Sequence, residues 1–292
     1  MKKLLLGALV LFVVVSNISA QEDQDWRPLY KLVDSSLQTK LDAEFKKIPQ
    51  LRKLIVQKKL AIGVVDMNGE MPKFARINGN KMMYAASLPK IAILLAAYQS
   101  FEDGSLEETE EIHSDLVNMI RTSDNHAATK IIDKVGFKKI SSVLKDPRYE
   151  LYDESRGGGL WVGKRYAKQG KRYPDPINSI SHGATVTQIC RFYYLLANHK
   201  LINYERSEQM LNDLSNPALN HKFVASLSKL APKADLFRKS GTWKQWHSDS
   251  VLVRSVDWRN YILTAMVESE DGSKIIERVV PIVEKVLRAE ES

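Results

Sequence analysis

The sequence is poor in cysteine: Cys190 is the single cysteine among 292 residues. A chain with one cysteine forms no internal disulfide, so its stability must come from the packing of an apolar core. Cys190 lies in the apolar segment TQICRFYYLL, which has the pattern of a buried helix. We therefore expect this thiol to be a small buried hydrophobic group and not a nucleophile.

The sequence also lacks a long apolar run beyond its first twenty residues. Its one concentrated apolar run, residues 4–15, follows two lysines, ends shortly before Ala20 and is shorter than the roughly 20 residues that span a bilayer. This pattern is typical of a secretory signal peptide cleaved near Ala20. We expect a signal peptide at 1–20 and one secreted or periplasmic domain at 21–292, without stable insertion in a membrane.

Motifs for metals and nucleic acids are missing as well. The six histidines form no His-Glu-x-x-His pair, no cysteine pair exists, and Lys and Arg are scattered without a basic helix. We expect no metal, no other cofactor and no nucleic-acid partner. The formal charge of +8 falls to +6 when Lys2 and Lys3 are lost with the signal peptide. A basic exported protein is attracted to anionic cell walls and membrane surfaces.

No internal repeat or low-complexity linker divides the chain, and its patterns change from strand to helix and back. β-Branched stretches with Asn-Gly turns occur near the start, and three more strand patterns occur near the end. The expected strands are LAIGVVDMNGE, KFARINGNKMMY, ADLFRKSGTW, SDSVLVRSV and RNYILTAMVES. Helical patterns cover 29–57, 88–101, 107–121, a segment opening near Ser123, 137–145, 185–198, 205–214, 219–230 and 274–288.

These patterns predict an α/β, two-lobed (α+β) architecture. Strands from both ends of the chain most simply share one antiparallel sheet, with the N- and C-terminal helices on one face. The helices from the middle of the chain form a second, all-helical lobe. A cleft between two such lobes is a common place for a chemical site.

The segment YAASLPKIAILLAAYQ, residues 84–99, places a serine and a lysine one turn apart at the head of an apolar helix. A structural interpretation is that Ser87 caps the helix, with Pro89 in its first turn and Lys90 in water. A chemical interpretation is that Lys90 activates Ser87 as a nucleophile. The Ser-x-x-Lys pattern alone does not decide, because it also occurs at 142–145 and 226–229.

Two further motifs follow in order: Ser-Asp-Asn at 123–125, between two expected helices, and Lys-Ser-Gly at 239–241, on an expected strand. With these three motifs, the chain resembles the penicillin-recognising serine hydrolases, and most closely the class A β-lactamases. The segments GVVDMNGE, YAASLPKIAIL, MIRTSDNHAATKII and LFRKSGTW also look like family segments. The resemblance spans roughly residues 40–288, is poorest over 155–183, and implies a β-lactamase/transpeptidase-like fold.

The resemblance implies catalytic roles for residues of the three motifs. Ser87 would be the nucleophile, Lys90 its base, and Ser123 the group that passes a proton to the leaving nitrogen. Burial and the charge of Lys239 would lower the pKa of Lys90. The backbone N–H groups of Ser87 and Thr242 would form the oxyanion hole.

The resemblance also implies which residues hold the substrate. The expected substrate-binding set is Asn125, Lys239, Ser240, Gly241 and Thr242. Its lysine, serine and threonine would bind the substrate carboxylate, and its asparagine would hold the substrate amide and the catalytic lysine. The carboxylate-binding arginine that is frequent in the family has no clear counterpart, and His247 or Arg254 could take its place.

The resemblance fails at the acid that activates water for deacylation. Class A β-lactamases carry it in a Glu-x-x-Leu-Asn motif, which this sequence does not contain. Counting from the preceding helix makes Glu154 the nearest candidate and Asp153 the second, with Asp175 further along, although Glu154 could also be a solvated loop residue. Counting back from the helix 185–198 instead reaches GKRYAKQGK, which has no acid. The two counts disagree because the loop is about a dozen residues longer than the family's.

Three functions remain open. A β-lactamase-like serine hydrolase would open β-lactam rings through an acyl-enzyme on Ser87. A D,D-peptidase or penicillin-binding protein would act on D-Ala–D-Ala peptides of the cell wall and would not need the missing acid. A non-catalytic cell-wall-binding protein could use the same scaffold, but the intact motifs argue against it. The overall resemblance favours the first, with a β-lactam or a peptidoglycan stem peptide as small-molecule partner and a monomeric protein.

Overall fold

The computed structural model describes residues 27–291, so the expected signal peptide at 1–20 lies outside the described residues. Its centre is a five-stranded sheet with the strand order β2-β1-β10-β9-β8. The strands are β1 (Leu60–Asp66), β2 (Lys73–Ile77), β8 (Asp235–Trp243), β9 (Trp246–Arg254) and β10 (Asn260–Glu268). All neighbours are antiparallel, and β1 pairs with β10, so the two ends of the chain share one sheet as the sequence predicts.

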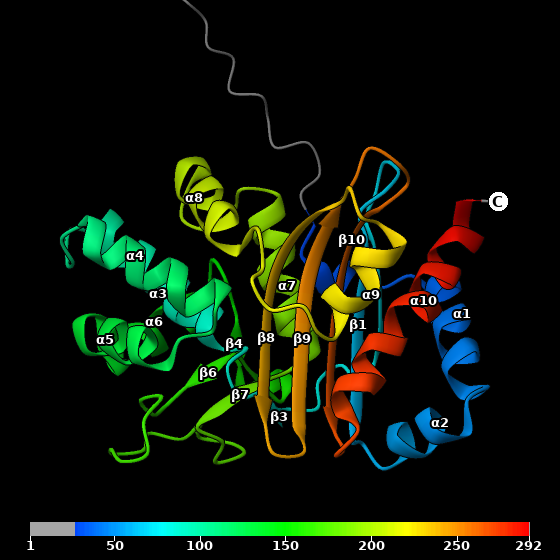
Figure 1. The fold of residues 1–292 in the computed structure, drawn as a ribbon, viewed down its shortest axis with the longest axis horizontal. Coiled ribbons are helices and arrows are strands. Elements are labelled where there is room, and N and C mark those ends of the chain that lie inside the picture. Colours follow the sequence, from blue (N-terminus) through cyan, green and yellow to red (C-terminus); the bar gives the residue numbers. More distant parts are fainter. Residues whose placement is uncertain (1–26, 292) are drawn as a thin grey trace, which may run out of the picture.

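Helices from both ends of the chain cover one face of this sheet (Figure 1). Because strand side chains alternate between faces, Ile62 of β1 and Leu263 of β10 are fully buried there, with Phe45 and Val279 of the covering helices. The helices of this layer are α1 (Ser35–Lys46), α2 (Pro49–Val56), α9 (Phe223–Leu230) and α10 (Gly272–Glu291). The predicted placement of N- and C-terminal helices on one face is confirmed.

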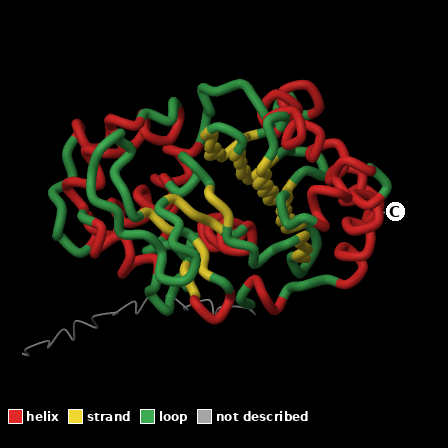
Figure 2. The backbone as a smooth tube through the Cα atoms, turned by 90° about the horizontal axis from the view of Figure 1, so that it is seen from below, coloured by secondary structure: helices red, strands yellow, loops and turns green. Residues whose placement is uncertain are grey.

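The other face of the sheet is covered by α7 (Val186–Ala197), and the helical lobe continues from there. Seen from below, the strands lie between the two groups of helices (Figure 2). The lobe contains α3 (Lys90–Glu102), α4 (Glu110–Arg121), α5 (Asn125–Val135), α6 (Phe137–Leu144) and α8 (Tyr204–Leu214). Helix α3 is buried along almost its whole length, as expected for a helix that is apolar on all sides.

Helix starts in this lobe are fixed by capping side chains. Thr109 Oγ1 accepts from Ile112 N at the start of α4, and Asp124 Oδ1 accepts from Ala127 N, 2.7 Å away, at the start of α5. Such caps satisfy backbone donors that have no partner inside the helix. The cap by Asp124 matters for the site, since it places Ser123 in the turn between α4 and α5.

Short strands occur where the sequence predicts only irregular chain. The residues between α6 and α7 form β4 (Tyr152–Asp153), the 3₁₀ turn η2 (Glu154–Arg156), β5 (Gly158–Gly159), β6 (Trp161–Val162) and β7 (His182–Ala184). Strands β6 and β7 form a small sheet with β3 (Met83–Tyr84), the strand that leads to Ser87. A first 3₁₀ turn, η1, covers Leu29–Lys31. Two-residue strands give no periodic pattern, so the sequence could not reveal them.

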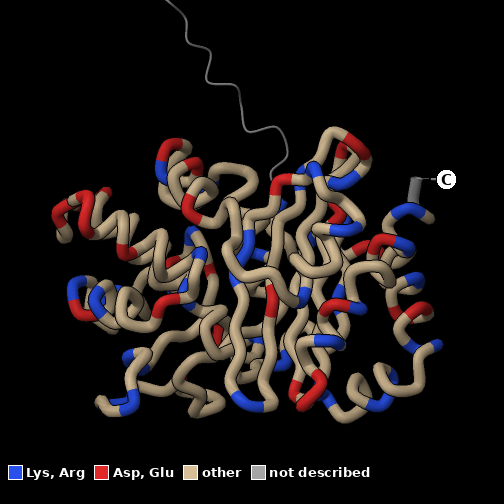
Figure 3. Tube along the Cα trace, viewed as in Figure 1, with Lys and Arg blue, Asp and Glu red and all other residues tan. Residues whose placement is uncertain are grey.

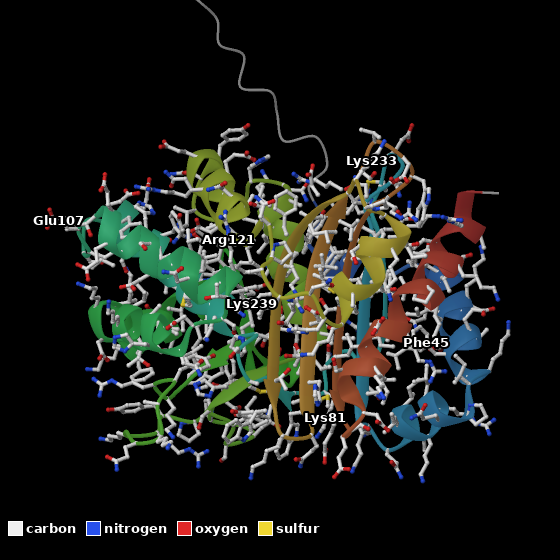
Figure 4. The ribbon with its side chains drawn as sticks, in the orientation of Figure 1. Phe45, Lys81, Glu107, Arg121, Lys233 and Lys239 are labelled. Atoms are coloured by element: carbon white, nitrogen blue, oxygen red, sulfur yellow. The ribbon has the colours of Figure 1, made fainter. Side chains whose placement is uncertain are left out.

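Edge strand β8 forms the boundary between the sheet and the helical lobe. Figure 4 shows Lys239 of β8 on this boundary, whereas Phe45 lies among the helices on the far side of the sheet. The boundary therefore brings a strand from the end of the chain against helices from its middle, as the predicted two-lobed architecture requires.

Cys190 is fully buried and burial raises the pKa of its thiol to about 12, which confirms its expected role as a packing residue. No helix within residues 27–291 is long and apolar enough to cross a membrane. Lys and Arg are spread over both lobes in the view of Figure 3.

Candidate active site

Ser87 lies in a turn between β3 and α3 and does not cap the helix. Helix α3 begins at Lys90, its N-cap position is Pro89, and no side chain caps it. The preceding residue, Ala86, has a φ of +51°, a left-handed conformation that is strained for a residue with a Cβ. The helix-cap interpretation of Ser87 is therefore wrong, and Lys90 is fully buried instead of pointing to water.

The turn that carries Ser87 is fastened to the main sheet. Ser248 Oγ donates to Ala85 O at 2.8 Å, and Gly241 of β8 lies against the same turn. A Cβ added at Gly241 would lie 2.2 Å from Ala85 O and 2.6 Å from Ser87 N, so only glycine permits this approach. Strand β8 thus runs directly beside the backbone of Ser87, where the expected oxyanion hole would form.

The ammonium group of Lys90 is held by the turn between α4 and α5. Its Nζ donates to Ser123 O at 2.7 Å, to Asp124 O at 3.1 Å and to Asn125 Oδ1 at 2.8 Å. Burial lowers the pKa of Lys90 to about 7, and the nearby Asp124 carboxylate opposes that shift. A lysine with such a pKa is partly neutral at neutral pH and can accept a proton from a hydroxyl group.

Ser123 joins Lys90 to Lys239. Lys239 Nζ donates to Ser123 Oγ at 2.9 Å and to Ser240 O at 2.9 Å, while Lys90 binds the Ser123 carbonyl. The φ of Ser123 is +63°, so this residue too is held in a left-handed conformation. Burial, followed by the charge of Lys90, holds the pKa of Lys239 well below its usual range. For Lys90 itself, burial lowers the pKa as expected, but the charge of Lys239 is not among the causes of that shift.

Lys222, which the sequence does not single out, lies beside Gly241 and Thr242 of β8. Its side chain is buried, and its Nζ donates to Gly241 O at 2.6 Å, to Thr242 Oγ1 at 2.8 Å and to Ser248 O at 3.1 Å. Burial lowers its pKa to about 8, so it remains largely charged at neutral pH. No sequence signal marks it, because a buried lysine looks like any other lysine in a sequence.

A buried ion pair holds the segment that carries Lys222. Arg238 Nε and Nη2 donate to the two carboxylate oxygens of Asp249 at 2.7 and 2.9 Å. Arg238 Nη1 also donates to Leu219 O, and Phe223 N donates to Asp249 Oδ2. The pair therefore ties the chain on both sides of Lys222 to strands β8 and β9, and breaking one partner would leave an uncompensated buried charge.

The two residues expected to replace the family's arginine lie in different places. His247 is the cross-strand neighbour of Thr242, but it is largely buried and its Nδ1 has no hydrogen-bond partner among the described residues. Arg254 lies at the other end of β9, where it donates to Ala197 O and stacks over Phe237. The positive charge beside Thr242 comes instead from Lys222.

The structure does not bring Glu154 to the serine and its lysines. Glu154 Oε1 pairs with Lys145 Nζ at 3.2 Å, and its side chain is 58% exposed. Asp153 pairs with Arg156 at 3.0 Å in the same turn. Nothing in this geometry supports the deacylating role expected of Glu154, and its surroundings match the solvated-loop interpretation.

Asp175 is also engaged away from the nucleophile. It is buried, accepts from Tyr152 OH at 3.1 Å and accepts three backbone N–H groups of residues 177, 178 and 180. These bonds give it a structural role in the long loop. Within residues 27–291, no group of three or more His, Cys, Asp or Glu side chains is arranged to hold a metal ion.

The long loop brings a tyrosine to the turn that carries Ser87. Tyr166 OH donates to Ala86 O at 3.1 Å, one residue before Ser87, and its ring centroid lies 4.6 Å from Lys90 Nζ. The sequence does not single out this tyrosine, because only the acids of the loop are candidates for activating water. No local pattern shows which residue of so long a loop returns to the site.

Comparisons with known proteins agree with this site. The model of the Beta-lactamase enzyme family matches residues 46–116 and 114–286. Among curated proteins, none matches the chain by sequence. Solved structures match most of the chain at low sequence identity, so the likeness to them is one of fold.

Three of these structures illustrate the likeness. PBP-A is 17% identical with a TM-score of 0.63, and the match covers 88% of this chain and 96% of PBP-A. A class A β-lactamase from Bacteroides cellulosilyticus is 13% identical with a TM-score of 0.65, covering 88% and 100%. The TLA-3 extended-spectrum β-lactamase is 11% identical with a TM-score of 0.66, covering 88% and 99%.

The family match and the fold point to the same conclusion. The matched segments contain all three motifs, and the structure gathers their side chains around Ser123. This chain belongs to the Beta-lactamase enzyme family and is a serine hydrolase of the class A β-lactamase-like type.

Proposed function

We propose that this protein is an exported serine hydrolase that opens β-lactam rings through an acyl-enzyme on Ser87. The observation that carries the proposal is the bridge at Ser123, whose carbonyl binds Lys90 and whose hydroxyl binds Lys239. Because Lys239 is the donor in that bond, the hydroxyl hydrogen of Ser123 stays available for a leaving nitrogen.

Acylation would proceed by proton transfer and attack. Neutral Lys90 takes the hydroxyl proton of Ser87, and Ser87 Oγ forms an ester bond with the lactam carbonyl carbon. The carbon–nitrogen bond of the lactam breaks, and the nitrogen takes a proton from Ser123 Oγ. Ser123 is reprotonated through the lysines, so the proton of Ser87 ends on the lactam nitrogen.

Charges and donors of β8 would bind the rest of the substrate. Thr242 is exposed and accepts from Lys222, so its own hydroxyl hydrogen can point to a substrate carboxylate. Lys222 and Lys239 add positive charge on both sides of that position. The N–H groups of Ser87 and Thr242 would face the developing oxyanion, where one donor is typically worth about 2.7–4 kcal/mol.

A D,D-peptidase or penicillin-binding role is the second candidate, and one observation favours it. The acids of the long loop that could activate water pair elsewhere, so the geometry supports acylation better than rapid deacylation. A variant of PBP-A, which shares this fold, has been solved as an acyl-enzyme complex with penicillin G. A peptide bond to a terminal D-alanine would be cleaved by the same steps, with the amine of D-alanine as leaving group.

Intact-protein mass spectrometry with benzylpenicillin tests the proposal. The protein should gain the mass of one penicillin, and Ser87→Ala should abolish the gain. Ser142→Ala and Ser226→Ala are matched controls from the other two Ser-x-x-Lys pairs and should keep it, since Ser142 is exposed and bonds only Lys139 O. An unmodified mass, under conditions in which a known penicillin-binding protein reacts, would refute the proposed function.

Export is part of the proposal and has its own test. The N-terminal pattern and the basic mature chain support a protein of the cell envelope or exterior. Cell fractionation and N-terminal sequencing of the purified protein should find it outside the cytoplasm, beginning at Gln21. An intact Met1 in a cytoplasmic fraction would contradict export.

A further inference from the structure

Tyr166 closes one side of the catalytic lysine. Lys90 donates to three oxygen atoms of the α4–α5 turn, and the ring of Tyr166 lies over the same ammonium group with its centroid 4.6 Å from Nζ. The contact is a cation–π interaction, which also excludes water from that side. The phenol oxygen reaches Ala86 O at 3.1 Å, so the ring spans from Lys90 to the turn of Ser87.

The ring is held in place from behind. It stacks on the imidazole of His182 with centroids 4.3 Å apart and an interplanar angle of 23°. His182 is buried on β7, and its Nε2 lies 2.9 Å from Lys164 O, two residues before the tyrosine. Between Lys164 and Tyr166, Arg165 Nε pairs with Asp133 of α5 at 2.5 Å. These contacts fix the loop at residues 164–166, so the ring position is built into the fold.

The base of the loop is equally constrained. Gly163 N donates to Ser181 O at 2.7 Å, and Tyr173 N donates back to Gly163 O at 2.6 Å. A Cβ added at Gly163 would lie 1.8 Å from Tyr173 O, so the two strands of the loop approach as closely as glycine allows. The loop is therefore a fixed wall of the site.

The chemistry of Tyr166 differs from that of a carboxylate. Burial raises the pKa of its phenol well above the usual value, so the group is a neutral donor at physiological pH. It donates to a carbonyl and accepts no proton from water. The ring that covers Lys90 supplies no base for the hydrolysis of an ester on Ser87.

We propose that Tyr166 is a shielding and positioning residue that keeps water from Lys90 and the ester on Ser87, so that the acyl-enzyme is long-lived. This inference rests on the proposed acylation of Ser87. In hydrolysis, a water oxygen adds to the ester carbonyl carbon while its proton passes to Lys90. The carbon–Oγ bond then breaks, and the proton returns to Ser87 Oγ. Tyr166 opposes the first of these events by covering Lys90.

The test separates acylation from deacylation. Wild type, Tyr166→Phe and Tyr166→Ala are acylated with benzylpenicillin, freed of excess drug, and followed by intact-protein mass spectrometry. The wild-type adduct should decay slowly, and Tyr166→Phe, which keeps the ring, should decay at a similar rate. Tyr166→Ala should lose its adduct at least about ten-fold faster, because water reaches a lysine that can act as its base. Its decay rate should rise with pH as Lys90 loses its proton, at a pH above the wild-type pKa of about 7, because the hydrated lysine is less strongly desolvated.

A second pair of variants guards against a damaged loop. Tyr166→Glu supplies a carboxylate at the same place and Tyr166→Gln is its matched control without a base, so the first should deacylate about 100-fold faster than the second. Tyr173→Ala removes a ring from the same loop that does not touch Lys90, and its adduct should decay like the wild type's.

The outcomes distinguish the two proposals. Absence of any adduct in the wild type refutes the proposed function. An adduct that forms but turns over rapidly in the wild type overturns the role of Tyr166. So does an adduct that decays at the wild-type rate in Tyr166→Ala. If Tyr166→Ala forms no adduct, the comparison of Tyr166→Glu with Tyr166→Gln decides. Equal decay rates of the adducts of these two variants would then overturn the inference.

Discussion

Lys90 and Lys239 are linked through opposite ends of one residue: Lys90 donates to the carbonyl of Ser123 at 2.7 Å, and Lys239 donates to its hydroxyl at 2.9 Å. Both ammonium groups are buried, so each has lost its hydration free energy. Only hydrogen-bond acceptors at close distance offset that loss. Their separation along the chain is 149 positions, and the boundary between the sheet and the helical lobe brings them together. Ser123 thus holds both buried lysines in one site, Lys90 through its backbone and Lys239 through its side chain.

The pH dependence of acylation should follow Lys90. Its pKa of about 7 lies below the ordinary 10.5, so the neutral amine that acts as base forms as the pH rises through 7. The acylation rate should therefore level off above that pH and fall about ten-fold per unit below it. Stopped-flow acylation with a chromogenic cephalosporin measures the profile.

Lys90→Arg provides the matching variant. Arginine keeps the positive charge but does not lose its proton, so acylation should slow by about 10²- to 10⁴-fold. Lys229→Arg, at the exposed lysine of the third Ser-x-x-Lys pair, is the control and should acylate normally. A wild-type acylation rate in Lys90→Arg would show that another group is the base.

The carboxylate preference should depend on Lys222. Replacing it with methionine keeps a similar volume but removes the donors to Thr242 and Gly241 and the buried charge. The acylation efficiency with a penicillin should fall about ten-fold, which is the size of one lost charged hydrogen bond, whereas the efficiency with the penicillin methyl ester should change little. In the wild type, the preference for the acid over the ester should weaken above pH 8, where Lys222 loses its proton.

The ratio of the acylation efficiency with the penicillin to that with its methyl ester is measured within each variant. Partial loss of folded protein therefore does not affect this ratio. Lys229→Met removes an exposed lysine of the neighbouring helix and serves as the control. An equal loss of efficiency with acid and ester would mean that Lys222 acts only through stability.

The motifs made most of this site predictable, because each is short and its residues are close neighbours in the sequence. Ser87 with Lys90, Ser123 with Asn125, and Lys239 with Ser240 are each fixed locally, and the structure brings the three pairs together. The alternation of strand residues likewise allowed the sheet and its two end helices to be predicted. Local sequence carried enough information wherever regular structure set the geometry.

The unpredicted residues depend on irregular chain. Lys222 has a φ of +56° and reaches β8 only because Arg238 and Asp249 hold its segment. Counting along the loop favours Glu154. The count cannot show that the chain turns at η2 and that the Glu154 carboxylate pairs with Lys145. Tyr166 reaches the site through a close approach at Gly163. Each of these positions is set by tertiary contacts that have no periodic signal.

Asp213 should make the folding stability depend on pH at a place far from the three motifs. The residue is 3% exposed in the helical lobe, and Tyr98 OH donates to its Oδ2 at 2.8 Å. Burial raises the pKa of its carboxyl from 3.8 to about 6, with the hydrogen bond from Tyr98 opposing the shift. In the unfolded chain the group ionises near the lower value. The stability that comes from the protonated form is therefore fully present below about pH 4 and is lost as the pH rises through 6.

Urea unfolding of the wild type and Asp213→Asn between pH 4 and pH 7.5 measures this effect. The shift of about two pKa units corresponds to about 3 kcal/mol. The asparagine variant cannot ionise, so its free energy of unfolding should gain about that amount relative to the wild type across this range. Taking the difference between the two proteins cancels the other groups that titrate there. Tyr98→Phe removes the opposing hydrogen bond and should move the wild-type loss to higher pH. A difference between wild type and Asp213→Asn that stays constant with pH would show that Asp213 ionises normally in the folded protein.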